Sequence, residues 1–140
     1  MSTFFLCYTT GMKNIKLYQE QLLDHYHHPR HKGIVENPDF TSDQVNPSCG
    51  DMIGFQGKIE DNRLTEVAFD GKGCILSLAA ASMLAEFAKD KPITQILAYN
   101  KETMHEMINL ALGPTRQQCI LLPLQALQSG IKNYLESAHA

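Results

Sequence analysis

The feature that most constrains the fold is a pair of short alternating segments, residues 52–60 and 64–70, joined by the turn sequence "EDNR". In the first segment, apolar residues alternate with small or polar ones: Ile53, Phe55 and Ile59 against Gly54, Gln56 and Lys58. In the second segment, Thr65, Val67 and Phe69 share one face. Alternation with a period of two is typical of strands, and Asp and Asn favour turns. The pattern predicts an antiparallel β-hairpin.

Helical periodicity dominates on both sides of this hairpin. Before it, residues 17–28 are predicted to form a helix that Pro29 ends, and residues 31–48 a long loop. After it, helices are predicted at 75–89, at 93–98, at 101–111 and from about Arg116 to Leu135, with Pro123 interrupting the last pattern early. We therefore expect an α+β fold in which a small antiparallel sheet of two to three strands packs against several helices.

The length of 140 residues suits one domain with a real core. We expect residues 12–140 to form it and residues 1–11 to be an N-terminal extension, with Met12 as an alternative start. Cys7 would then lie outside the working protein.

Composition excludes several classes of function. With 44% hydrophobic residues and a net charge of -3, the chain lacks the basic surface typical of nucleic-acid binding. Its longest apolar stretch, "CILSLAAASMLAEFA", is broken by polar residues, which argues against a membrane span. The N-terminus lacks the features of a signal peptide. We expect a cytoplasmic protein with neither nucleic acid nor membrane as a partner.

Three cysteines fall at predicted element ends. Cys49 lies just before the first strand, Cys74 just after the second at the start of a helix, and Cys119 in the first turn of the last helix. Because the start of one strand and the end of its antiparallel partner are neighbours, Cys49 and Asp51 should lie near Cys74. The sequence alone does not place Cys119 beside them.

The surroundings of these cysteines suit thiolates. A helix start and Lys72 flank Cys74, and Arg116 precedes Cys119 by one turn. Thiolates with one carboxylate suit zinc or an iron–sulfur cluster. Two plainer interpretations remain open: the cysteines are scattered structural residues, and Asp51 is a turn residue.

Four motifs together resemble the IscU/NifU-type iron–sulfur cluster assembly scaffolds, which include the SufU-like proteins. They are "LYQEQLLDHYHHPRHKG", "NPSCGD", "GKGC" followed by "SLAAASML", and "RQQCILLPLQAL". The resemblance covers about residues 15–137, in order and without large gaps.

The resemblance implies a carrier protein that is not an enzyme. Such a scaffold accepts sulfur from a cysteine desulfurase, combines it with iron from a donor into a labile [2Fe–2S] cluster, and passes the cluster to apo-proteins. By the same resemblance, Cys49, Cys74 and Cys119 are cluster ligands and Cys119 is the persulfide acceptor. Asp51 would keep the cluster labile and can itself ligate metal, and zinc can occupy the same site.

The chain departs from the family pattern before the third cysteine. IscU-type members carry a histidine there, where this chain has Gln118. The Leu-Pro-Pro-Val-Lys segment that binds an Hsp70-type chaperone is not preserved in "LGPTRQQ", which puts that partner in doubt. SufU-type members lack the histidine but carry an insertion that this chain is too short to contain. Thr115 and Gln118 also fit a helix capping box, which is the preferred explanation of Gln118.

The histidines offer a weaker metal hypothesis. His25, His27, His28 and His31 cluster in "HYHHPRH". His25 matches a family position on a helix and the other three are expected to be exposed, so a metal site there is disfavoured. His105 is predicted to be a surface residue of a helix.

Two further functions compete with the scaffold. The missing histidine favours a zinc-bound sulfur acceptor that activates a desulfurase without building clusters. A zinc or thiol hydrolase would need a general base beside the cysteines, and the motifs supply none.

Overall fold

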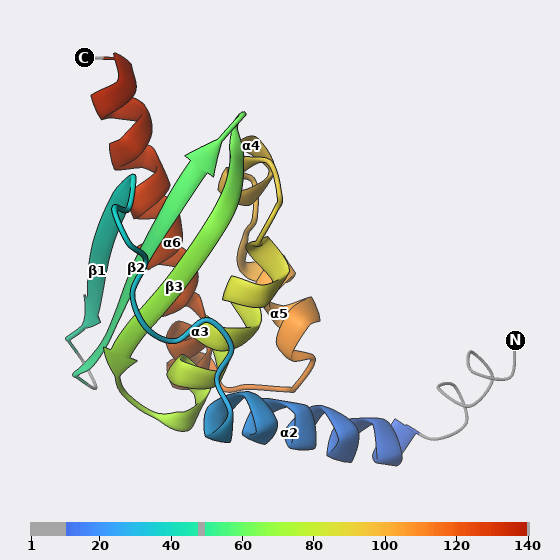
Figure 1. The fold of residues 1–140 in the computed structure, drawn as a ribbon. Coiled ribbons are helices and arrows are strands. Elements are labelled where there is room, and N and C mark those ends of the chain that lie inside the picture. The colour runs from blue at the N-terminus through green and yellow to red at the C-terminus, as the bar shows by residue number, and fades with distance from the viewer. Residues whose placement is uncertain (1–10, 48–49, 140) are drawn as a thin grey trace, which may run out of the picture.

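The computed structural model describes residues 11–47 and 50–139, and it confirms an α+β fold with a three-stranded antiparallel sheet of order β1-β2-β3. The elements are α2 (Gly11–His27), β1 (Phe40–Asn46), β2 (Asp51–Glu60), β3 (Arg63–Lys72), α3 (Ile75–Ala88), α4 (Ile93–Leu97), α5 (Lys101–Ile108) and α6 (Pro114–His139). Helices α3 and α6 lie against one face of the sheet, and α2 crosses below its lower edge (Figure 1). No helix in the described part of the chain is long and apolar enough to cross a membrane.

The predicted hairpin is the pair β2 and β3. Asp61 and Asn62 occupy the two-residue turn with φ of 53° and 61°, the left-handed values that such tight hairpin turns require. A register shift at Lys58/Ile59 leaves Thr65 as an extra residue, so Ile59 pairs with Leu64. Leu64 therefore takes the buried position, and the prediction that Thr65 shares a face with Val67 is wrong.

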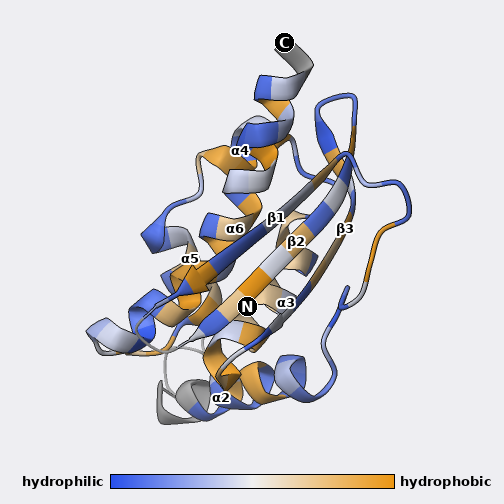
Figure 2. Cartoon of the chain, turned by 90° about the vertical axis from the view of Figure 1, so that its left-hand side faces the viewer, coloured by the Kyte–Doolittle hydropathy of each residue, from blue (hydrophilic) through white to orange (hydrophobic). Residues whose placement is uncertain are grey.

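The predicted loop over 31–48 is wrong in its second half, because residues 40–46 form the edge strand β1. Its buried side chains include two polar ones, Ser42 and Asn46, so no apolar alternation marks it. Ser42 Oγ donates a hydrogen bond of 2.6 Å to the Ala126 carbonyl of α6, which compensates its burial. Figure 2 shows β1 as a mainly hydrophilic strand over the apolar interior.

The core lies between the sheet and the helices. Its largest fully buried side chains come from the sheet and the helices alike: Phe55, Phe69, Ile53, Leu64, Leu84, Ile93, Ile96, Met104, Ile108, Ile120, Leu127 and Ile131. α3 packs against α2, α6 and the sheet, and its alanines are fully buried. Small side chains let the backbones of these elements approach closely.

The last helix starts earlier and runs further than predicted. It begins at Pro114, whose ring suits the first helical position. Thr115 therefore lies inside the helix and cannot be its N-cap, so the predicted capping box with Gln118 is wrong. Instead the Gln117 amide side chain donates a hydrogen bond of 3.0 Å to the Leu112 carbonyl. Pro123 lies within the continuous helix and does not end it.

His25 ties α2 to α3. It is buried, in contrast to the exposed His27 and His28 on the same stretch. Its Nδ1 lies 2.8 Å from Ser82 Oγ, which also accepts a bond of 2.7 Å from the Arg30 N–H. The serine proton then points at Nδ1, which fits a neutral imidazole with its proton on Nε2, 3.7 Å from the Glu86 carboxylate.

This arrangement predicts a pH-dependent stability. Burial and the nearby Arg30 charge lower the pKa of His25 below its ordinary 6.5, against the opposing charges of Glu86 and Asp24. In the unfolded chain His25 therefore binds a proton near pH 6.5, whereas in the folded protein it binds one only at a lower pH. The free energy of unfolding should fall as pH drops below about 6.5, by at most about 1.4 kcal/mol per pH unit from this group.

Urea unfolding between pH 8 and 5 measures this effect. His25→Gln should flatten the slope below pH 6.5, whereas His27→Gln should keep the slope of the unaltered protein. Equal slopes for all three proteins would show that His25 does not titrate differently on folding.

Candidate metal and thiol site

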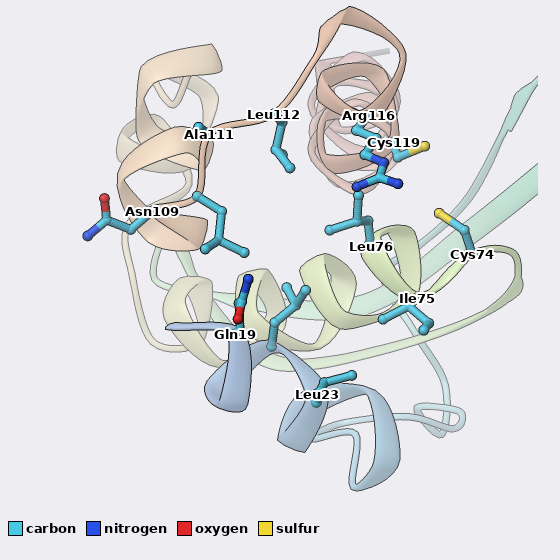
Figure 3. A pocket seen from close by; sticks show the side chains of 12 residues that line it. Gln19, Leu23, Cys74, Ile75, Leu76, Asn109, Ala111, Leu112, Arg116 and Cys119 are labelled. Atoms are coloured by element: carbon cyan, nitrogen blue, oxygen red, sulfur yellow. The ribbon is translucent and has the colours of Figure 1, made fainter. Parts of the chain in front are cut away.

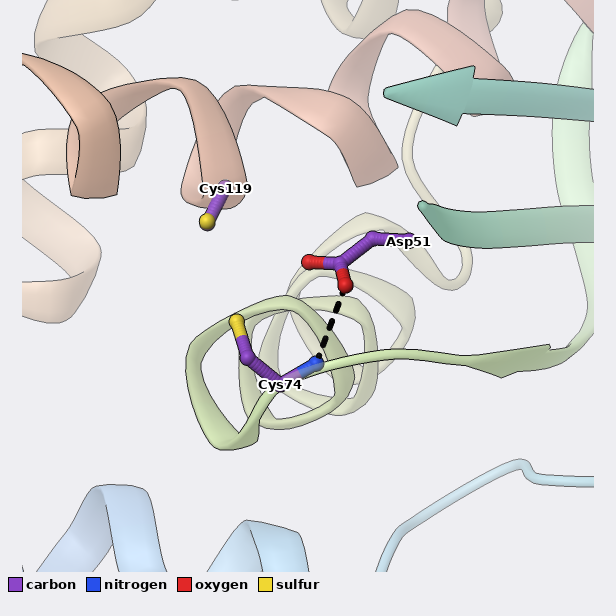
Figure 4. Close-up of side chains that lie close together, drawn as sticks. All are labelled: Asp51, Cys74 and Cys119. Carbon is purple, nitrogen blue, oxygen red and sulfur yellow. Dashed lines mark hydrogen bonds between the residues drawn. The ribbon is translucent and has the colours of Figure 1, made fainter. Parts of the chain in front are cut away.

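Three predicted site residues converge in the structure. One ligand atom each from Asp51, Cys74 and Cys119 lies within 4.8 Å of the others. Asp51 is the first residue of β2, Cys74 directly precedes α3, and Cys119 lies in α6. Their side chains point into one small space (Figure 4). Cys49, like Cys7, lies outside the described residues.

Asp51 reaches Cys74 because of the hairpin register. Met52 pairs with Lys72, so the chain leaving β3 passes the start of β2. A Cβ on Gly73 would lie 2.8 Å from the Asp51 carboxyl carbon, so only glycine fits between these residues. The inferred proximity of Asp51 to Cys74 is confirmed, while that of Cys49 stays a prediction. The interpretation of Asp51 as a turn residue is wrong, because Asp51 pairs with Asn46 in the sheet.

The carboxylate of Asp51 is 5% exposed and is held at both oxygens. Oδ1 accepts the Cys74 N–H at 3.3 Å, and Oδ2 accepts the Ser77 hydroxyl at 2.7 Å. Hydrogen bonds to a charged carboxylate are stronger than neutral ones. They fasten the first residue of β2 to the first turn of α3.

Cys74 is the N-cap of α3. Its Sγ accepts a hydrogen bond of 3.5 Å from the Ser77 N–H, the place where an N-cap oxygen usually acts. The side chain is exposed, so the sulfur is open to a partner or a metal.

Cys119 lies deeper than predicted. Because α6 begins at Pro114, Cys119 falls in the second turn and not the first. Cys119 is only 6% exposed, and the next residue, Ile120, is fully buried in the core. The placement of Cys119 beside Asp51 and Cys74 comes from the packing of α6 on α3.

Ser77 is the residue that sequence reasoning missed. It is fully buried, and its hydroxyl lies 2.7 Å from Asp51 Oδ2, 3.5 Å from Cys74 Sγ and 3.3 Å from the Cys119 carbonyl oxygen. One side chain thus contacts all three converging residues. The spacing Cys-x-x-Ser after a strand, typical of an N-cap and its N3 residue, was the available signal.

An apolar groove opens beside the two cysteines. Its volume is about 870 Å³, and it lies between α2, the start of α3, the segment 109–112 and the start of α6. Leu23 and Ile75 line it and are each 42% exposed. Arg116 extends over it next to Cys119 (Figure 3). A partner's side chain or loop could enter here and reach both sulfurs.

The histidines stand apart from this site. His27 and His28 are exposed as predicted, whereas the predicted exposure of His31 is wrong because His31 is half-buried. His105 is also half-buried, and His25 is buried between α2 and α3. Among the described residues, no histidine belongs to the candidate ligand group.

The donor set fits a thiophilic metal. Zinc and cluster irons take thiolates readily, while a carboxylate oxygen is a harder ligand that matches cluster iron less well. A zinc–sulfur bond is about 2.3 Å, so donors on one ion lie within about 4.6 Å of each other. Small rotations of the side chains would bring these three donors onto one ion.

The fold and the site define a class of protein: a small α+β domain that presents two thiols and a buried carboxylate at one end of its sheet, beside an apolar groove. The model of the NifU-like N-terminal domain family matches residues 17–140, and the chain belongs to that family. The IscU/NifU-type resemblance of its motifs is thereby confirmed.

The relatives include both types of protein considered from the motifs. The iron–sulfur cluster assembly scaffold protein IscU of Aquifex aeolicus is 35% identical over 120 residues, covering 84% of this chain and 76% of the relative. The zinc-dependent sulfurtransferase SufU of Bacillus subtilis is 32% identical over 132 residues, covering 82% and 89%. A solved N-terminal part of a nitrogen-fixing NifU-like protein from Brucella abortus shares the fold, with a TM-score of 0.70 at 20% identity over 85% and 94% of the two chains.

We call the two hydrogen bonds from the Cys74 N–H and the Ser77 hydroxyl to Asp51 the carboxylate bridge, and we expect its removal to lower stability. Asp51→Ala leaves the Cys74 N–H and the buried Ser77 hydroxyl without this acceptor, so metal-free protein should lose about 1–3 kcal/mol in its free energy of unfolding. Urea unfolding in the presence of a chelator measures it. Asp70→Ala, which removes an exposed carboxylate from the same sheet, should change stability by less than about 0.5 kcal/mol. Equal stabilities of the two variants would contradict the bridge.

Proposed function

We propose that the protein is an iron–sulfur cluster assembly scaffold. It accepts sulfur from a cysteine desulfurase, holds a labile [2Fe–2S] cluster and passes it to apo-proteins. The observation that carries this proposal is the convergence of Asp51, Cys74 and Cys119 beside an open apolar groove. The IscU-type relatives support it.

Each residue has a distinct role in this proposal. Cys119 is the persulfide acceptor: its thiolate attacks the outer sulfur of the desulfurase persulfide, a new S–S bond forms, and the desulfurase cysteine leaves as a thiolate. Cys49, Cys74 and Cys119 ligate the cluster, which is the cargo of the protein. Asp51 supplies the harder oxygen ligand, which lets the cargo leave more readily than four thiolates would.

The partners follow from the same chemistry. A desulfurase would bring its persulfide through the groove, where Cys74 is exposed and Cys119 lies behind it. An iron donor and recipient apo-proteins complete the cycle, in a cytoplasmic setting. The protein is proposed as a carrier, which transfers cargo and is not a classical enzyme. The single-domain span 12–140 stays a prediction of the sequence, as does the expectation that an Hsp70-type chaperone is a doubtful partner.

A second function has its own support. Gln118 replaces the IscU-type histidine and is exposed, and one relative is named a zinc-dependent sulfurtransferase. Zinc would then occupy the same site, with Cys49, Asp51, Cys74 and Cys119 as its ligands, and Cys119 would take sulfur without building a cluster. The structure adds no support for a hydrolase, since no described histidine lies in the ligand group where it would act as a general base.

Anaerobic reconstitution with iron, cysteine and a desulfurase tests the scaffold. The unaltered protein should develop visible charge-transfer absorption, and Cys74→Ala and Cys119→Ala should reduce it at least several-fold because each removes a cluster ligand. Cys7→Ala is the matched control and should leave it unchanged. A spectrum that develops equally in all four proteins, or in none, would contradict the scaffold.

Two measurements on the same preparations separate the zinc alternative. Mass spectrometry of Cys119 after desulfurase treatment should show a persulfide under either function. Metal analysis of freshly purified protein then shows whether zinc is bound. Stoichiometric zinc with a persulfide but without cluster absorption would favour the sulfur acceptor. An unmodified Cys119 would contradict both.

A further inference from the structure

Ser77 has more hydrogen-bond acceptors around it than protons to give. Its hydroxyl carries one proton, yet both Asp51 Oδ2 and the Cys119 carbonyl oxygen lie within hydrogen-bonding distance, at 2.7 and 3.3 Å. The shorter contact and the charge of the carboxylate favour Asp51 as the acceptor. The Cys119 carbonyl is then the alternative acceptor of the same proton.

Pro123 explains why that carbonyl takes part. In an α-helix the Cys119 carbonyl would accept the N–H of the residue four positions later, and that residue is Pro123, which has none. Its ring also crowds the carbonyl four positions earlier, which turns it out of the helical bonding direction. The Ser77 hydroxyl of the neighbouring helix α3 lies within hydrogen-bonding distance of that carbonyl oxygen. Pro123 thus couples the cysteine of α6 to the serine of α3.

The Ser77 backbone adds a contact to the second thiol. Its N–H donates to Cys74 Sγ at 3.5 Å, and that bond does not depend on the side chain. Removing the hydroxyl therefore removes its short bond to Asp51 and its longer contacts with Cys74 Sγ and the Cys119 carbonyl, while the backbone helix cap at Cys74 remains.

We propose that Ser77 is the positioning residue of the site, whose hydroxyl holds the Asp51 carboxylate in the orientation that binds a metal together with Cys74 and Cys119. This inference rests on the proposed function, because it assumes that the three residues hold metal or a cluster. Hydrogen bonds from outer residues fix the rotamer of a metal-binding carboxylate, and their loss typically costs 10–100-fold in metal affinity.

Zinc titration of metal-free protein against a chromophoric chelator tests the proposal. Ser77→Ala should raise the zinc dissociation constant 10–100-fold. The variant should fold, since alanine is the best helix former and α3 already contains many buried alanines. Circular dichroism of the metal-free variant checks this. Ser82→Ala is the matched control: it is an equally buried serine of the same helix whose hydroxyl serves His25, and its zinc affinity should stay within about twofold.

A double-mutant cycle shows whether Ser77 acts through Asp51. In an Asp51→Ala background, Ser77→Ala should change zinc affinity by less than about twofold, because the carboxylate it positions is gone. A full loss that persists in that background would overturn the proposal. So would equal affinities of Ser77→Ala and the unaltered protein.

The outcomes separate this inference from the function beneath it. If the unaltered protein binds zinc and loses it in Cys74→Ala, but Ser77→Ala binds normally, the positioning role fails and the metal site stands. If the unaltered protein binds no zinc at this site, both the positioning role and the metal site are overturned.

Discussion

The pair of hydrogen bonds on the Asp51 carboxylate is the interaction on which the rest of the site depends. Through the Cys74 N–H and the Ser77 hydroxyl, it joins the start of β2 to the first turn of α3. Buried carboxylates are costly unless they are hydrogen-bonded or paired, so this side chain stabilises the protein only in this arrangement. The bonds that satisfy it also place it beside two thiols. The same contacts would therefore serve both folding and the metal binding that we propose.

The two described cysteines lie at different depths. Cys74 is exposed at a helix N-terminus, while Cys119 lies almost buried behind it. A partner that enters the groove meets Cys74 at the rim and Cys119 further in. A sulfur carried on Cys119 would be sheltered from solvent by the core around Ile120. Such shelter suits a group that must persist between its arrival and its use.

Much of this was predictable from local patterns, and the failures have physical reasons. The hairpin could be predicted because Ile53, Phe55 and the "EDNR" turn follow strand and turn rules, and it alone brought Asp51 to Cys74. The strand β1 could not, because Ser42 and Asn46 point inward and the Ala126 carbonyl of α6 compensates Ser42. Cys119 joins the site through packing of distant helices, which no local pattern encodes. Ser77 was hidden in an apolar, alanine-rich run where a serine attracts no notice until its neighbours are known.

The most direct test of the account is the coordination shell of the metal itself. Zinc K-edge X-ray absorption on zinc-loaded protein should show sulfur ligands at about 2.3 Å together with a light ligand at about 2.0–2.2 Å. Cys74→Ala and Cys119→Ala should each reduce the number of sulfur ligands. That result would establish that one ion is held by thiolates from α3 and α6. A shell made only of nitrogen and oxygen, or a sulfur number unchanged in both variants, would contradict the claim that these residues form one metal site.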